Sequence, residues 1–203
     1  MSENTPTSIA MKAVASTIAR IQRSPEAPSS KRDLAALKRQ VGRPLDEAPI
    51  SVLLLVSVGD EIESNDLRNT VETAIHSTLT MWAKNGIDSH VPGVSVGALT
   101  AKFYDPAQGE VDAGARRRYD QAISNADAPL EMTATRVRRL IQLAQSKGHG
   151  GLDYAKLAAD LIALQNPDRA QDVRRRWALD LNRGTHSSRN RHAAETSTTS
   201  TIN

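Results

Sequence analysis

Apolar residues recur at spacings of three and four along most of the chain, which is the spacing of one face of an α-helix. The pattern is clearest in the second half, where Val137, Leu140, Ile141 and Ala144 form one stripe. Further stripes of this kind begin at Ala10, Leu34, Leu67, Tyr154 and Ala170. This pattern predicts an all-α protein.

The ends of several helices are marked by capping residues. Ser95 and Asp153 suit helix N-termini because their side chains accept hydrogen bonds from free backbone N–H groups. The helix that starts at Asp153 is expected to end at Asn166, because Pro167 disfavours helical geometry in the residue before it. We expect Asp168 to cap the last helix, in which Trp177 turns inward.

The run from Ile50 to Val58 is so apolar and β-branched that a buried strand competes with a helix. No second strand of similar strength lies nearby, so a lone strand would leave its backbone groups unpaired. We therefore predict a buried helix here.

Polar segments divide the chain into three parts. We predict an N-terminal helical half over residues 7–104, a linker, and a C-terminal basic helical bundle over residues 112–183. Residues 184–203 are poor in apolar residues and rich in Ser and Thr, so we predict a disordered tail. The fold class is thus all-α, with two small helical bundles joined by a linker.

Charge is distributed unevenly between the halves. Up to residue 115 there are 11 Lys+Arg against 14 Asp+Glu, and from residue 116 onward 15 against 9. This asymmetry favours a polyanionic partner for the second half, although solvated or paired arginines are the commoner case on helices. Arg176 and Asp180, at positions i and i+4, are predicted to form such a pair.

Composition narrows the possible chemistry. The chain has no cysteine, and its five histidines lack metal-ligand spacing, so we expect no metal, no cofactor and no catalytic activity. No apolar run is long enough to span a bilayer, and we expect a cytoplasmic protein without a membrane partner. With one Phe, three Tyr and two Trp, base stacking is a poor mode of nucleic-acid binding. Arginines that contact phosphates would bind without sequence preference.

Several segments, in order, resemble one known family. They are His90 to Gly97, Arg117-Arg118-Tyr119, Val137 to Leu143, Leu152 to Ala158, and Val173 to Trp177, preceded by a basic segment from Ala36 to Arg43. Together these segments resemble the small subunit of the type I-E CRISPR Cascade surveillance complex, the CasB family. The resemblance covers roughly residues 31–183. This chain departs from the family at Leu179, Leu181 and Asn182, where relatives commonly place aromatics.

The resemblance implies an all-helical, non-catalytic protein that assembles with other Cascade subunits and a second copy of itself. It also implies contact with guide RNA, target DNA and the displaced single-stranded DNA, where positive charge and shape suffice because base pairing reads the sequence. Carried over by position, Arg138 and Arg139 are the first candidates for strand contact. The other candidates are Lys38, Arg39, Arg43, Lys102, Arg118, Arg169, Arg174 and Arg175.

Two alternatives stay open. The first is a free-standing basic DNA-binding protein that uses the turn before the last helix as a helix-turn-helix. The proline in that turn and the scarcity of Asn, Gln and Ser on the last helix argue against it. The second is a purely structural adaptor, which predicts no affinity for nucleic acid even at low salt.

Overall fold

The computed structural model describes residues 5–124 and 128–199 of the 203, and the side chains up to residue 194. The described part is mostly helical, as predicted. Its elements are α1 (Pro6–Arg23), α2 (Pro28–Arg39), η1 (Leu45–Glu47), α3 (Ile50–Val56), η2 (Gly59–Glu61), α4 (Asn65–Asn85), η3 (Ile87–Ser89), α5 (Val96–Ala101), β1 (Tyr104–Asp105), β2 (Glu110–Val111), α6 (Ala113–Ile123), α7 (Leu130–Ser146), α8 (Tyr154–Ala163) and α9 (Pro167–Thr199).

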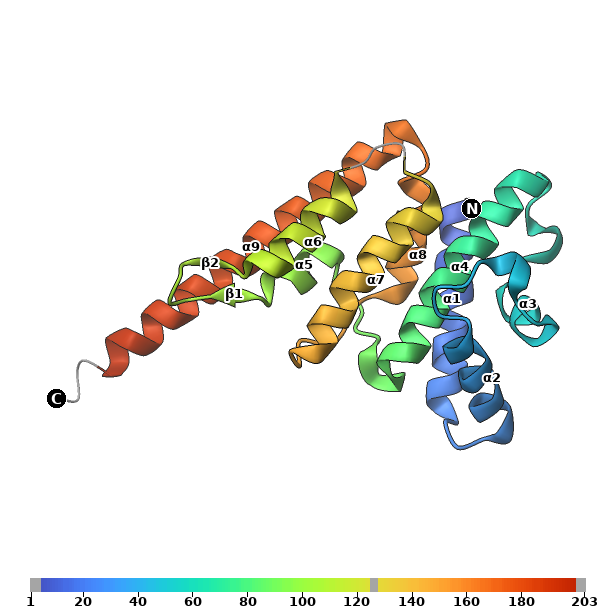
Figure 1. Ribbon diagram of the computed structural model, residues 1–203, viewed down its shortest axis with the longest axis horizontal. Coiled ribbons are helices and arrows are strands. Elements are labelled where there is room, and N and C mark those ends of the chain that lie inside the picture. The colour runs from blue at the N-terminus through green and yellow to red at the C-terminus, as the bar shows by residue number, and fades with distance from the viewer. Residues whose placement is uncertain (1–4, 125–127, 200–203) are drawn as a thin grey trace.

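The central helix is α4, which contacts α1, α2 and α3 from the first half of the chain and α7 and α8 from the second. Helix α8 also lies along α1, and α5 lies along α9 (Figure 1). Helices from the two halves of the sequence therefore share one hydrophobic core. The prediction that residues 7–104 and 112–183 are separate units stays a prediction.

The predicted helix starts at Ser95 and Asp153 are confirmed. The Ser95 hydroxyl accepts a hydrogen bond from the Ala98 N–H at 3.2 Å, and the Asp153 carboxylate accepts one from the Lys156 N–H at 2.9 Å. The last helix begins at Pro167, and the Asn166 side chain accepts the Asp168 N–H at 2.9 Å. Asp168 therefore lies inside the first turn and is not the cap.

The apolar run at Ile50 forms a helix, α3, and not a strand. The prediction that this helix is buried is wrong for one of its faces. Val52 and Val56 are buried, but the side chains of Ile50 and Leu54 are 76% and 77% exposed. The helix is short and lies at the periphery of the molecule, beside α2 and α4, so only one face reaches the core (Figure 1).

Helix α9 does not end at Arg183, where the sequence predicts a disordered tail, but continues to Thr199. Two contacts explain the first turns of this extension. Gly184 lies close against Ala101 of α5, and Arg189 donates hydrogen bonds to the Tyr104 hydroxyl and the Gly109 carbonyl. Residues 200–203 of the predicted tail lie outside the described residues.

The predicted linker contains a small antiparallel hairpin, in which Tyr104 pairs with Val111 and Asp105 with Glu110. Figure 1 shows α9 passing this hairpin and projecting beyond it toward the C-terminus. Among the described helices, none is both long and apolar enough to cross a membrane.

Candidate nucleic-acid interface

Two of the predicted arginines, Arg43 and Arg138, meet at one cavity of about 170 Å³. Arg43 comes from the turn after α2, and Arg138 from the middle of α7. The cavity lies between this turn, α4 and α7, and its lining residues are Gly42, Arg43, Pro44, His76, Ser77, Thr80, Met81, Glu131, Ala134, Thr135 and Arg138. The fold thus joins basic residues that lie far apart in the sequence.

Gly42 determines how closely the two segments approach. Its φ is +78°, a conformation that residues with a side chain rarely adopt. A Cβ at this position would overlap the guanidinium of Arg138. The glycine therefore permits the sharp turn that follows α2 and leaves room for Arg138 to lie against the backbone.

Neither Arg43 nor Arg138 belongs to any of the ion pairs in the described part of the chain. Arg43 is exposed and Arg138 is half-buried. Neither guanidinium donates a hydrogen bond to another group within the described residues, so the N–H donors of both are left for water or a ligand. These two side chains are therefore available to an anion.

The cavity floor contains a buried histidine that the sequence did not single out. His76 is 2% exposed, and within the part of the chain that the structure describes its Nε2 has no hydrogen-bond partner. Burial lowers the pKa of His76 below its usual value, so the imidazole is neutral at pH 7. In the sequence, His76 is marked only by its position next to Ile75, in the apolar stripe of a predicted helix. The structure shows that this helix, α4, is buried on nearly all sides from Thr73 to Ala83.

The other polar side chains that line the cavity include hydroxyls and one acid. Ser77, Thr80 and Thr135 provide hydroxyls, and Glu131, in the first turn of α7, provides a carboxylate. Two guanidiniums with nearby hydroxyls suit a phosphate group. The Glu131 carboxylate repels an anion on its own side of the cavity, so the side nearer the arginines is the more favourable place for an anion.

The other predicted residues lie on several surfaces. Lys38 and Arg39 are exposed in the last turn of α2, just before the cavity turn, and Arg139 is exposed on α7. Lys102 donates to the Gly150 carbonyl at 3.1 Å, and Arg118 to the Gly114 carbonyl at 2.9 Å.

Three more predicted arginines belong to α9. Arg169 and Arg175 are exposed, whereas Arg174 is half-buried and its Nε has no partner. No observed contact joins this group to the cavity of Arg43 and Arg138.

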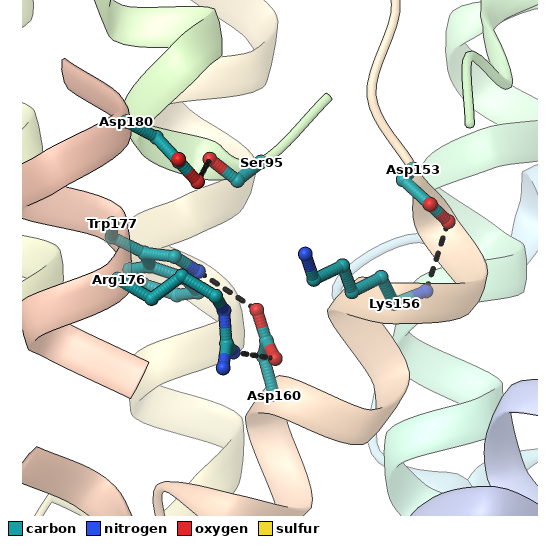
Figure 2. Close-up of polar contacts among 7 residues, drawn as sticks. All are labelled: Ser95, Asp153, Lys156, Asp160, Arg176, Trp177 and Asp180. Carbon is teal, nitrogen blue, oxygen red and sulfur yellow. Dashed lines mark hydrogen bonds and ion pairs between the residues drawn. The ribbon is translucent and has the colours of Figure 1, made fainter. Parts of the chain in front are cut away.

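A further arginine of α9, Arg176, serves the fold instead. Its guanidinium forms an ion pair with Asp160 of α8, and the indole N–H of Trp177 donates to the other oxygen of that carboxylate at 2.8 Å (Figure 2). The predicted pair between Arg176 and Asp180 is therefore wrong. Asp180 accepts a hydrogen bond from the Ser95 hydroxyl at 2.7 Å instead.

Asp160 is 5% exposed. Burial raises the pKa of Asp160 above its usual value, while Arg176 and Trp177 act in the opposite direction. Both carboxylate oxygens are satisfied, as a buried acid requires. This network holds α9 against α8, and it does not resemble a catalytic site.

Within the described residues, no group of three or more His, Asp or Glu side chains is arranged to hold a metal ion. Most of the aromatic rings are unavailable for stacking with bases, because Trp82, Trp177, Tyr119 and Tyr154 are among the largest fully buried side chains and Phe103 is also buried, whereas Tyr104 is half-buried. The surface that remains for nucleic acid is one of arginines and lysines.

Comparison with known proteins supports one family. The model of the family described as CRISPR-associated protein Cse2 matches residues 33–181. The fold is similar to the crystal structure of CasB from Thermobifida fusca, with a TM-score of 0.67 and 22% identity, over 85% of this chain and 97% of that one. No curated protein matches the sequence. Because the family match spans well over half of the chain, the chain belongs to the Cse2/CasB family, the non-catalytic small subunit of the type I-E CRISPR Cascade complex.

Proposed function

We propose that this Cascade subunit stabilises the R-loop by binding phosphates of the guide RNA–target DNA duplex and the displaced DNA strand. The observation that carries the proposal is the meeting of Arg43 and Arg138 at one cavity, without a carboxylate partner for either. Because base pairing with the guide reads the sequence, the protein needs to provide only positive charge in the right place.

The neighbouring basic residues extend this surface in two directions. Lys38 and Arg39 continue it along the end of α2, and Arg139 continues it along α7. We assign the more distant Lys102, Arg118, Arg169, Arg174 and Arg175 to secondary contacts with the same nucleic acids. Other Cascade subunits and a second copy of the chain would position these surfaces along the strands.

The test is a double charge reversal, Arg43→Glu with Arg138→Glu, in the assembled complex. A charge-assisted hydrogen bond contributes about 1.5–3 kcal/mol, so each lost contact should weaken target binding by about tenfold or more. The dependence of affinity on salt should also become shallower, because fewer counterions are released on binding. Both quantities are measured by titrating labelled target DNA at several salt concentrations.

The matched control is Arg116→Glu with Arg117→Glu, which makes the same charge change on α6 at two exposed arginines, of which Arg116 is already paired with Asp120 at 3.0 Å. We expect a much smaller effect on target binding from this variant. Equal losses from both variants would mean that net charge, and not this cavity, determines binding. Sequence-selective binding of duplex DNA by the isolated chain would favour the free-standing alternative.

A further inference from the structure

A second surface of the molecule lies on α3. It is apolar with acidic ends, in contrast to the basic surface around the cavity of Arg43 and Arg138. Along this helix Ile50, Leu53 and Leu54 occupy positions i, i+3 and i+4 and therefore share one face. Their side chains are 76%, 38% and 77% exposed. The buried residues Val52 and Val56 lie on the other face, toward the core. The fold uses one apolar face of α3 and leaves the other in contact with water.

The two ends of α3 are acidic. Asp46 and Glu47 lie in η1, just before the helix, and Asp60 and Glu61 lie in η2, just after it. All four are exposed, and none belongs to an ion pair in the part of the chain that the structure describes. From residue 44 to residue 67 there are six Asp+Glu and no Lys or Arg.

This combination determines what can bind there. An exposed apolar patch with a polar rim is typical of a protein–protein contact. An acidic rim repels nucleic acid and attracts lysines and arginines. A symmetric contact between two copies of α3 would place two acidic rims opposite each other, which like-charge repulsion disfavours. In the function proposed above, the basic surface of a second copy is already in contact with phosphates.

We propose that the outer face of α3 is the docking surface for a different protein subunit of the complex, whose contact surface has apolar side chains surrounded by lysines and arginines. In this arrangement α3 attaches the subunit to its neighbour, and the cavity of Arg43 and Arg138 stays free for nucleic acid. The proposal rests on membership of the complex, and its preference for a different subunit over the basic surface of a second copy rests on the proposed phosphate contacts.

The absence of cysteine makes a direct test simple, because Leu54→Cys introduces a single thiol. A benzophenone maleimide on this thiol is photo-crosslinked within the complex assembled with guide RNA. Met11→Cys is the matched control, since Met11 is also an exposed apolar residue, on α1. We expect the Leu54 probe to crosslink to one other protein subunit, at a segment rich in Lys or Arg, with much less product from Met11.

Three outcomes would overturn the proposal. They are crosslinking of the Leu54 probe to a second copy of the chain, crosslinking to nucleic acid, and a yield no higher than that of Met11. Any of them leaves the effect of Arg43→Glu and Arg138→Glu on target binding unchanged, so failure of this proposal is distinct from failure of the proposed function.

A charge test complements the crosslink. We expect Asp60→Lys with Glu61→Lys to lower the fraction of this subunit retained in the complex, as measured by native mass spectrometry. The control is Glu110→Lys, at an exposed acid of the hairpin. Circular dichroism of each variant checks that the fold is intact. Equal retention of both variants would contradict the acidic contribution to docking.

Discussion

Arg176 and Arg138 are the same residue type in two different environments, and the contrast separates structure from binding. Arg176 is paired with the buried carboxylate of Asp160, which also accepts the indole N–H of Trp177 (Figure 2). Arg138 lies against Gly42 at the edge of a cavity and belongs to none of the ion pairs of the described residues.

The different partners of these two arginines show that an arginine cluster in the sequence is not by itself a binding surface. In the cluster of Arg174, Arg175 and Arg176, the guanidinium of Arg176 is already paired with Asp160. Arg138, in a similar cluster, is left available because its guanidinium lies against the backbone of Gly42 and, within the described residues, forms no ion pair with the Glu131 carboxylate of the same cavity. Changing these two regions separately should therefore affect stability in one case and affinity in the other.

The largest effect is expected from Asp160→Ala. This change leaves the buried indole N–H of Trp177 without an acceptor, which costs roughly 1–3 kcal/mol, and removes a partly solvated ion pair worth about 1 kcal/mol. We expect the free energy of unfolding to fall by roughly 2–4 kcal/mol in urea denaturation. Asp172→Ala, at an exposed acid of α9, should change it by less than about 0.5 kcal/mol. Similar values for the two variants would show that the network contributes little.

A second test acts through the backbone on the other contact of α9, that with α5. A Cβ at Gly97 of α5 would overlap the carbonyl of Trp177, so Gly97→Ala should force α5 and α9 apart. Overpacking of this kind costs about 1–3 kcal/mol. Gly150→Ala is the control, because nothing lies within 4 Å of a Cβ there. Thermal unfolding of both variants measures the difference, and a neutral Gly97→Ala would mean that the helices adjust without cost.

The corresponding test of the cavity is Gly42→Ala. The new Cβ displaces the guanidinium of Arg138 and also strains the backbone, at about 1 kcal/mol. Gly59→Ala introduces backbone strain at a φ of +58°, but no atom lies within 4 Å of its Cβ. We expect both variants to lose some stability and only Gly42→Ala to weaken target binding by the complex. Equal affinities would place Arg138 outside the nucleic-acid interface.

The smallest effect concerns pH and His76. Burial lowers the pKa of His76 in the folded protein, so the unfolded chain binds more protons as pH falls below about 6.5. The free energy of unfolding should then decrease with falling pH, by at most about 1.4 kcal/mol per pH unit from this group. The charged groups that line the same cavity are Arg43, Arg138 and Glu131.

The measurement for this prediction is urea denaturation between pH 7 and pH 5. The pH dependence should be shallower in His76→Gln, which has no titrating group at that position. His186→Gln, at an exposed residue of α9, should keep the dependence of the unmodified protein. Identical slopes in all three proteins would contradict the assignment to His76.

Local sequence patterns are sufficient to predict the helical fold class, the starts of α5 and α8 at Ser95 and Asp153, and the burial of Tyr154 and Trp177. These features depend on residues within one or two turns of each other, so spacing and capping residues are sufficient to predict them. The order of the family's segments along the chain also pointed to the family to which the chain belongs.

Contacts between residues far apart in the sequence became visible in the tertiary structure alone. Arg176 finds its partner on α8 and not at i+4, because Asp160 is brought to it by packing of α9 on α8. Arg43 and Arg138 share a cavity across 95 positions of sequence, and the second apolar face of α3 stays uncovered. Such contacts depend on the relative placement of whole helices, which local periodicity does not encode.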